Sequence, residues 1–157
     1  MKYIVFDIDG VLADSSEREQ KYLIGKERKD INWGLFYKDV SNDEPIKAGI
    51  LTATAFTFYS AGCELVFITG RNESVREQTI DWLSYQLVLD KEKINLYMRH
   101  DGDTTTNSKF KESIGEQLGF ENIIIAFDDN GSTVDMWRSH GVTCYQTDKR
   151  DFKQNNY

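Results

Sequence analysis

Two aspartates separated by one residue, Asp7 and Asp9, follow an apolar run near the start of the chain and precede Gly10. A second acidic pair, Asp128 and Asp129, follows another apolar run near the other end. Carboxylate oxygens are ligands that Mg²⁺ prefers, and a cation between them offsets the repulsion of like charges. The two pairs therefore predict a magnesium site if the fold brings them together.

Groups suited to binding a phosphate lie between the two acidic pairs. Thr69-Gly70-Arg71 ends one apolar run, Arg99 ends a second, and Lys111 lies in a segment with helical spacing. A hydroxyl can donate to a phosphate oxygen, arginine can contact two oxygens at once, and lysine adds a point charge. In isolation each residue also fits a turn, a surface charge or a solvated helix position. Their ordered placement along the chain favours phosphoryl transfer.

The elements that must position these residues alternate between apolar runs and amphipathic stretches. We predict strands over residues 3–9, 64–69, 94–98, 122–127 and 141–146, and helices over residues 47–61, 74–87, 107–118 and 132–139. Strands that alternate with helices indicate an α/β fold, with a Rossmann-like, parallel, five-stranded sheet flanked by helices. Because the carboxyl ends of parallel strands share one edge of the sheet, the candidate groups are expected to converge there.

Two of the predicted helices carry local patterns of their own. Apolar or small residues recur at three- and four-residue intervals in the first, at Ala48, Leu51, Ala55 and Phe58. The second begins with Ser74-Val75-Arg76-Glu77, which matches a capping box, in which serine and glutamate side chains satisfy the first backbone N–H groups.

Residues 14–46 interrupt the alternation of strands and helices. The segment is polar and charged, and its aromatic residues include Trp33, Phe36 and Tyr37. It is too short for a separate domain. We therefore predict one domain over residues 1–157, with a cap-like insertion at 14–46 that covers or frames the site and a polar tail at 148–157.

The chain has 157 residues and a formal net charge of −7. This charge weighs against strong non-specific binding to nucleic acid, but it allows a nucleic-acid end to be held locally. No run approaches the ~18 apolar residues of a membrane span, and the first residues do not resemble a signal peptide, so no membrane partner is expected. Cys63 and Cys144 form no CxxC motif and are expected to be free thiols, which favours a cytoplasmic location.

The ordered set of motifs resembles that of the haloacid dehalogenase (HAD) superfamily of phosphatases. The motifs of that superfamily are Asp-x-Asp-Gly, a Thr or Ser at the end of the second strand, a Lys, and a terminal acidic pair. In this chain they stand as Asp7-Ile8-Asp9-Gly10, Thr69, Lys111 and Asp128-Asp129. The resemblance spans nearly the whole chain and implies the HAD fold.

The same resemblance implies a role for each matched residue. Asp7 would be the nucleophile that forms an aspartyl-phosphate, and Asp9 the general acid and then the general base. Thr69 and Lys111 would bind the transferring phosphoryl group. The ligands of Mg²⁺ would be Asp7, the backbone carbonyl of Asp9, Asp128 and Asp129.

A closer resemblance is to the 3′-phosphatase domain of phage-type polynucleotide kinase–phosphatases. It rests on Arg18, on Gly70-Arg71 and on the run from Arg99 to Asp103. The resemblance implies that Arg18, Gly70, Arg71 and Arg99 bind the substrate.

The chain departs from that family at Asn107, where an acidic residue usually stands four positions before Lys111. The acidic residue helps to orient the lysine, so the departure puts part of the orientation of Lys111 in question. Asn107 is also a candidate N-cap of the predicted helix. No GxxxxGK[ST] motif occurs, so no kinase site is expected within this sequence.

Three functions remain open at this point. The first is a Mg²⁺-dependent phosphatase that removes 3′-phosphates from DNA or RNA ends. The second is a phosphatase of small phosphomonoesters, such as a 5′(3′)-nucleotidase, with Trp33, Phe36 and Tyr37 as candidates for stacking on a base. The third is a non-catalytic, receiver-like phosphoacceptor module. Against it, Met98-Arg99 lies where the acceptor aspartate of a receiver would follow the third strand.

Overall fold

The computed structural model describes residues 1–59 and 62–147. The polar tail predicted at 148–157, and the last two residues of the helix predicted over 47–61, lie outside the described residues. The strands are β1 (Lys2–Phe6), β2 (Ala13–Asp14), β3 (Glu44–Pro45), β4 (Cys63–Asn72), β5 (Asn95–Arg99), β6 (Ile123–Asp128) and β7 (Thr143–Gln146). The α-helices are α1 (Ser16–Tyr22), α2 (Trp33–Lys38), α3 (Lys47–Tyr59), α4 (Arg76–Leu87), α5 (Asn107–Leu118) and α6 (Gly131–Ser139). Short 3₁₀ helices are η1 (Arg28–Asp30), η2 (Asp39–Asn42), η3 (Glu73–Val75), η4 (Lys91–Lys93) and η5 (Phe120–Asn122).

The predicted parallel, five-stranded sheet is confirmed. Its strands pair in the order β5-β4-β1-β6-β7, and every neighbouring pair is parallel. β1 lies in the centre, where Phe6 is in register with Phe67 of β4 and with Phe127 of β6. Because these strands run in one direction, β1, β4 and β6 present the residues that follow them side by side at one edge of the sheet.

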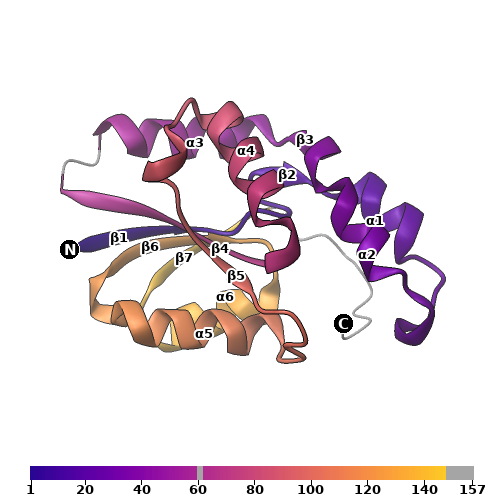
Figure 1. Cartoon of the computed structure of the whole chain (residues 1–157). Coiled ribbons are helices and arrows are strands. Elements are labelled where there is room, and N and C mark those ends of the chain that lie inside the picture. Colours follow the sequence, from indigo (N-terminus) through magenta and orange to yellow (C-terminus); the bar gives the residue numbers. More distant parts are fainter. Residues whose placement is uncertain (60–61, 148–157) are drawn as a thin grey trace.

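Helices cover both faces of the sheet, α3 and α4 on one side and α5 and α6 on the other (Figure 1). The side chains of β1 alternate between the two cores. Ile4 and Phe6 pack in the core that includes α3 and α4, whereas Val5 packs in the core that includes α5 and α6. Successive strand side chains point to opposite faces, so an unbroken apolar strand requires cover on both.

In the described ranges, no helix is long and apolar enough to cross a membrane.

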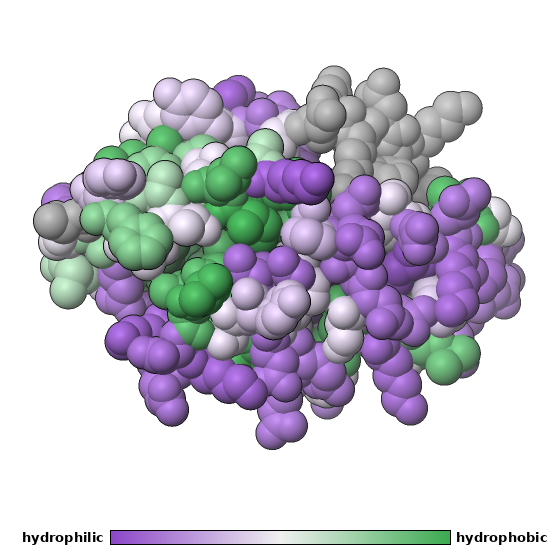
Figure 2. Space-filling model, turned by 90° about the horizontal axis from the view of Figure 1, so that it is seen from above, coloured by the Kyte–Doolittle hydropathy of each residue, from purple (hydrophilic) through white to green (hydrophobic). Residues whose placement is uncertain are grey.

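Helix α3 forms where its apolar stripe predicts a helix, but that stripe is not the buried face. Leu51 and Phe58 are 70% and 77% exposed, whereas the buried positions are Gly49 and Ala53. The helix has no charged residue after Lys47, so its sequence does not mark which face points inward. Seen from above, most of the apolar side chains on this surface lie over its left half (Figure 2).

The capping box predicted at residues 74–77 is wrong. A 3₁₀ turn, η3, precedes α4, and the side chain of Asn72 caps that turn by accepting a hydrogen bond from the backbone N–H of Ser74 at 2.9 Å. Helix α4 then begins at Arg76 without a side-chain cap. The extra turn moves the helix start past Ser74, so this residue cannot occupy the N-cap position.

The segment after β1 leaves the sheet and returns through the antiparallel pair of β2 and β3. Between these two strands the chain forms α1 and α2, which lie beyond the carboxyl edge of the sheet (Figure 1). Trp33, Phe36 and Tyr37 of α2 pack on one another, with ring centroids 5.2–6.1 Å apart. The insertion therefore lies beside the edge of the sheet where the strands end, and its aromatic residues pack on one another.

Candidate active site

Three carboxylates and one ammonium group meet at the carboxyl edge of the sheet. Asp7 follows β1, Asp128 ends β6, and Asp129 comes next; one carboxylate oxygen of each lies within 4.8 Å of the others. Nζ of Lys111, from α5, lies 3.0 Å from Oδ2 of Asp7 and 2.6 Å from Oδ2 of Asp128. The fold thus unites residues that lie more than 100 positions apart in the sequence.

Burial governs the electrostatics of this cluster. It raises the pKa of the Asp7 carboxyl, and the positive charge of Lys111 only partly opposes that effect. Burial alone would lower the pKa of Lys111, but Asp128 and Asp7 outweigh it and raise the pKa. Lys111 is 2% exposed and is therefore a fixed cation between two carboxylates.

The cluster fits a hard divalent cation. Oxygen ligands from carboxylates are what Mg²⁺ takes, and it usually keeps several waters beside one or two such groups. Asp7, Asp128 and Asp129 supply three carboxylates around a small space, and Lys111 balances only one of their charges. A further positive charge is thus what the donor set lacks.

Asp9 points to different partners from Asp7. Strand β1 ends at Phe6, before Asp9. The Asp9 carboxylate accepts hydrogen bonds from Nε and Nη2 of Arg71, with Nη2 2.7 Å from Oδ1. Nη2 of Arg18 lies 2.9 Å from the same oxygen. Burial acts to raise the pKa of Asp9, but the two guanidinium groups outweigh it and lower the pKa to about 2. Asp9 is therefore an anion in the substrate-free molecule.

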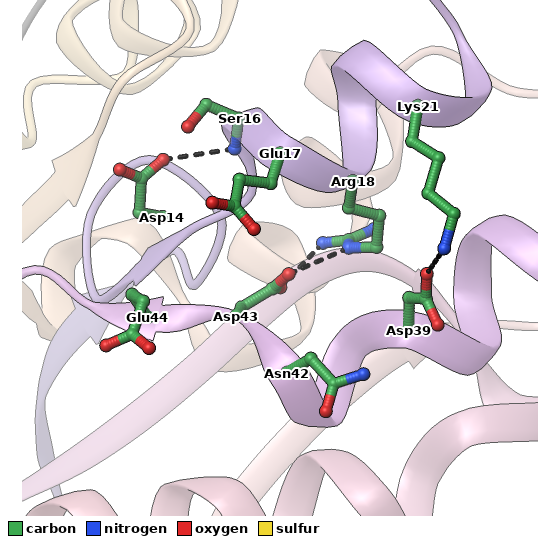
Figure 3. Close-up of a pocket in the computed structure, with 9 residues that line it drawn as sticks. All are labelled: Asp14, Ser16, Glu17, Arg18, Lys21, Asp39, Asn42, Asp43 and Glu44. Atoms are coloured by element: carbon green, nitrogen blue, oxygen red, sulfur yellow. Dashed lines mark hydrogen bonds and ion pairs between the residues drawn. The ribbon is translucent and has the colours of Figure 1, made fainter.

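Asp43, from the insertion, holds the two arginines in place. Its carboxylate accepts hydrogen bonds from Nε and Nη2 of Arg18 at 3.0 and 2.8 Å and from Nη2 of Arg71 at 2.8 Å. Figure 3 shows Arg18 reaching from α1 to Asp43, beside a separate pair of Lys21 and Asp39. Arg18 and Arg71 are 4% and 1% exposed, so the network is buried.

Asp43 is the site residue that sequence reasoning missed. It stands among ordinary polar residues, Asn42 and Glu44, at the end of a segment without regular periodicity. Its place in the site depends on the β2–β3 pair, which returns the insertion to the start of α3. No local sequence pattern marks it.

Gly10 allows the loop after β1 to pass close to the acidic pair. Its φ of +84° lies in the left-handed region, which favours glycine. A Cβ at this position would lie 2.2 Å from Oδ2 of Asp129. Two features therefore require a glycine in the first motif: the backbone conformation at Gly10 and the close approach of the Asp129 carboxylate.

Thr69 is fully buried within β4, which continues to Asn72, three residues beyond the predicted strand end. Its Oγ1 accepts a hydrogen bond from the backbone N–H of Arg71 at 3.2 Å. A hydroxyl that accepts one bond still has its own hydrogen to donate. Thr69 also fixes the backbone that carries Arg71 toward Asp9.

Arg99 and Asn107 lie beside the site rather than in its acidic cluster. Nη2 of Arg99 donates to Oδ1 of Asn107 at 2.7 Å, and Nη1 donates to the backbone carbonyl of Thr105. Thr106, not Asn107, caps α5, because its side chain accepts from the backbone of Lys109. Asn107 therefore orients Arg99, and the two aspartates hold Lys111.

A hollow of about 370 Å³ lies between the insertion and the ends of β4 and β5. We call it the aromatic hollow. One wall consists of Trp33, Phe36 and Tyr37, and the opposite wall includes Gly70, Arg99 and Asn107. Gly70 directly follows Thr69, so the hollow adjoins the candidate phosphate-binding residues.

Comparisons with known proteins show the family and the fold. The sequence profile of the family described as "Polynucleotide kinase PNKP phosphatase domain" matches residues 1–152. A chain in the Pnkp1/Rnl/Hen1 RNA repair complex superposes with a TM-score of 0.70 at 22% identity, covering 96% of this chain and 43% of that chain. This chain thus spans less than half the length of that protein.

Two further solved structures share the fold. The class C acid phosphatase from Bacillus anthracis superposes with a TM-score of 0.61 at 17% identity, over 99% of this chain and 75% of that chain. A HAD hydrolase of family IA, variant 3, from Entamoeba histolytica gives 0.60 at 14% identity, over 99% and 90%. At these identities the likeness extends to the fold alone.

Proposed function

Since the chain belongs to the family of PNKP phosphatase domains within the HAD superfamily, we propose that it removes 3′-phosphate groups from nucleic-acid ends with the help of Mg²⁺. Family membership makes the chain a phosphatase. The observation that carries the rest of the proposal is the meeting of Asp7, Asp128 and Asp129 around the ammonium group of Lys111. Such a site combines a carboxylate nucleophile with charge that stabilises a phosphoryl group.

In this proposal the ligands of Mg²⁺ are the carboxylates of Asp7, Asp128 and Asp129 and the backbone carbonyl of Asp9. When bound, the cation neutralises charge on the phosphate and on the acidic cluster. Lys111 bridges Asp7 and Asp128, with Nζ within 3.0 Å of both carboxylates, and its charge offsets their mutual repulsion.

Asp7 attacks the phosphorus atom in the first step. A bond forms between its carboxylate oxygen and phosphorus, the bond from phosphorus to the ester oxygen breaks, and that oxygen takes a proton from Asp9. Thr69 and Lys111 stabilise the phosphoryl oxygens during this transfer. Asp9 then removes a proton from water, which attacks phosphorus and releases inorganic phosphate and free Asp7.

Asp9 must gain a proton before it can act as the acid. Arg71 and Arg18 keep it ionised in the substrate-free molecule. A phosphate dianion competes for the same guanidinium groups, and among the described residues Nη1 of Arg71 has no hydrogen-bond partner and can donate to it. We therefore assign Arg18 and Arg71 to substrate binding and to control of the Asp9 proton.

A nucleic-acid end is the substrate class that the comparisons favour. The family is that of the phosphatase domain of the polynucleotide kinase PNKP, and one similar chain belongs to an RNA repair complex. A second candidate is a nucleotidase acting on mononucleotides. The observation that favours it is the aromatic hollow, whose 370 Å³ falls within the size range of small-molecule pockets.

A phosphate-release panel in Mg²⁺ tests the proposal. Its substrates are a 3′-phosphorylated oligonucleotide, the 5′-phosphorylated counterpart, and nucleoside 3′- and 5′-monophosphates. We expect the 3′-phosphorylated oligonucleotide to give the highest kcat/KM. A preference for monomers would favour the nucleotidase, and a preference for the 5′-phosphate would overturn the proposal.

Variants in the same panel test the nucleophile. Asp7→Asn is expected to abolish phosphate release from every substrate. Asp135→Asn, at an exposed position on α6, is the matched control and should retain full activity. Turnover by Asp7→Asn would remove Asp7 from the proposed mechanism.

A further inference from the structure

We propose that the aromatic hollow binds the base of the nucleotide whose 3′-phosphate is removed, by stacking it on Trp33 and Tyr37. This inference rests on the proposed function and adds the part of the substrate that the site recognises. It predicts that the terminal base, and not only the phosphate, contributes to substrate binding.

The hollow is built by the same segments that carry the phosphate-binding residues. Gly70 lies between Thr69 and Arg71, and Asn107 begins α5, one helical turn before Lys111. The wall is tightly packed at this point, because a Cβ on Gly70 would lie 2.5 Å from Oδ1 of Asn107. A phosphate near Lys111 and Thr69 therefore has its nucleoside beside the hollow.

The opposite wall offers aromatic surface that is fixed in place. The rings of Trp33 and Tyr37 lie 6.1 Å apart and are inclined by only 29°, so their planes are nearly parallel. Phe36, in the same wall, is buried and packs edge-on against both rings. A base that stacks here gains its binding energy from contact with a π-face, which every base has.

The aromatic wall is also linked to the catalytic site. The guanidinium carbon of Arg18 lies 4.3 Å from the ring centre of Phe36, and Nη2 of the same residue contacts Asp9 at 2.9 Å. One arginine thus contacts both the aromatic wall and the candidate acid–base residue. Packing through Arg18 therefore couples the position of α2 to that of Asp9.

Polar groups on the facing wall suit the sugar-phosphate part of the strand. Arg99 is held by Asn107 and by the carbonyl of Thr105, and it contributes positive charge to the hollow. These groups provide charge and hydrogen bonds that every nucleotide can use. We therefore expect little preference among the four bases but a clear requirement for a base.

Two oligonucleotides of equal length with a 3′-phosphate, one with a normal terminal nucleotide and one with an abasic terminal nucleotide, test this inference. In the wild type we expect kcat/KM to be roughly 10-fold lower for the abasic end, mostly through KM. In Trp33→Leu and Tyr37→Leu the difference between the two substrates should shrink. Tyr85→Leu, which alters an 81% exposed tyrosine on α4, is the matched control and should keep it.

Fluorescence gives a second readout that does not depend on turnover. Of the three tryptophans, Trp82 and Trp137 are 7% and 0% exposed, whereas Trp33 lines the hollow. Titration of the Asp7→Asn variant with a 3′-phosphorylated dinucleotide should quench emission, and the abasic analogue should not. The quenching should vanish when Trp33→Leu is added.

The outcomes separate this inference from the proposed function. Equal kcat/KM for the normal and abasic ends in the wild type, with no quenching, would overturn base stacking while leaving the 3′-phosphatase intact. No release of phosphate from either end would overturn the proposed function. Circular dichroism and thermal melting of the Trp33 and Tyr37 variants identify any loss that is due to unfolding, and the wild-type comparison of the two ends decides the question without them.

Discussion

Oδ2 of Asp43 lies 2.8 Å from Nη2 of Arg71, although the first residue belongs to the insertion and the second to the central sheet. The same oxygen lies 2.8 Å from Nη2 of Arg18. Both arginines also bind Asp9. One carboxylate from the insertion therefore sets the position of two cations on the candidate acid–base residue.

Asp43→Ala is expected to lower both stability and activity. It leaves two buried guanidinium groups with one carboxylate between them, and removal of one partner of a buried pair costs about 3–5 kcal/mol. We expect a loss of at least this order in urea unfolding, and a kcat at least about 10-fold lower because Arg18 and Arg71 lose their anchor. Asp90→Ala, in the exposed pair with Lys93, is the control and should change little. Equal behaviour of the two variants would contradict the role of Asp43.

Lys111→Met is expected to reduce phosphate release to below about 1% of the wild type. Without the ammonium group, Asp7 and Asp128 lose the charge that lies within 3.0 Å of both. The transferring phosphoryl group also loses a cation worth several kcal/mol in the transition state. Lys109→Met, two residues away and exposed on the same helix, is the control and should keep its activity. Activity of Lys111→Met near that of Lys109→Met would remove the lysine from the site.

The sheet and its acidic cluster are predictable because each depends on local patterns. Apolar runs mark the strands, and residues at their carboxyl ends must meet once the strands are parallel. Asp7 and Asp128 follow from that rule alone. The different surroundings of Asp7 and Asp9 do not follow from that rule. They depend on where β1 ends and on how the insertion folds back over Arg18.

Other features depend on tertiary packing that spacing does not encode. Helix α3 has no charged residue after Lys47, so the sequence predicts the helix and not its buried face. Gly49 faces inward because the loop after β1 lies against it. The start of α4 was misplaced because Asn72 caps a 3₁₀ turn first. In both cases a contact from outside the helix decides the outcome.

Addition of Mg²⁺ is expected to raise the melting temperature. The cluster of Asp7, Asp128 and Asp129 concentrates negative charge that one ammonium group does not balance, and a ligand that binds only the folded state stabilises it. We expect a shift of at least about 2 °C at millimolar Mg²⁺, measured by calorimetry against NaCl of equal ionic strength. In Asp129→Asn the shift should be much smaller. An unchanged shift in that variant would place the cation elsewhere.

Gly49→Ala is expected to destabilise the protein by about 2–3 kcal/mol, the upper part of the range for overpacking. A Cβ at this position would lie 1.9 Å from the carbonyl oxygen of Val11, in the loop that follows Asp7 and Asp9. That backbone must move for the methyl group to fit, so activity should fall as well. Gly34→Ala is the control, since the nearest atom to its Cβ is the side chain of Asn32 at 3.5 Å. Unfolding in urea should therefore show a loss of stability in Gly49→Ala and none in Gly34→Ala.

Cys144 is expected to make stability fall with rising pH in alkaline solution. Burial, with the charge of Asp128, raises the pKa of this thiol from 9.0 to about 12 in the folded state. Between these values the unfolded chain releases the thiol proton and the folded chain retains it, so the unfolded state binds fewer protons and the free energy of unfolding decreases. Below pH 8 the group has no such effect.

A comparison with Cys144→Ala isolates this contribution, because both proteins share every other titrating group. Between pH 9 and 10.5 the free energy of unfolding should fall more steeply in the wild type than in the variant. Cys63, which is half-buried at the start of β4, gives the matched variant Cys63→Ala, expected to follow the wild type. Parallel curves of unfolding free energy against pH for all three proteins would contradict this prediction. They would mean that the Cys144 thiol ionises as readily in the folded chain as in the unfolded one, so that burial beside Asp128 does not raise its pKa.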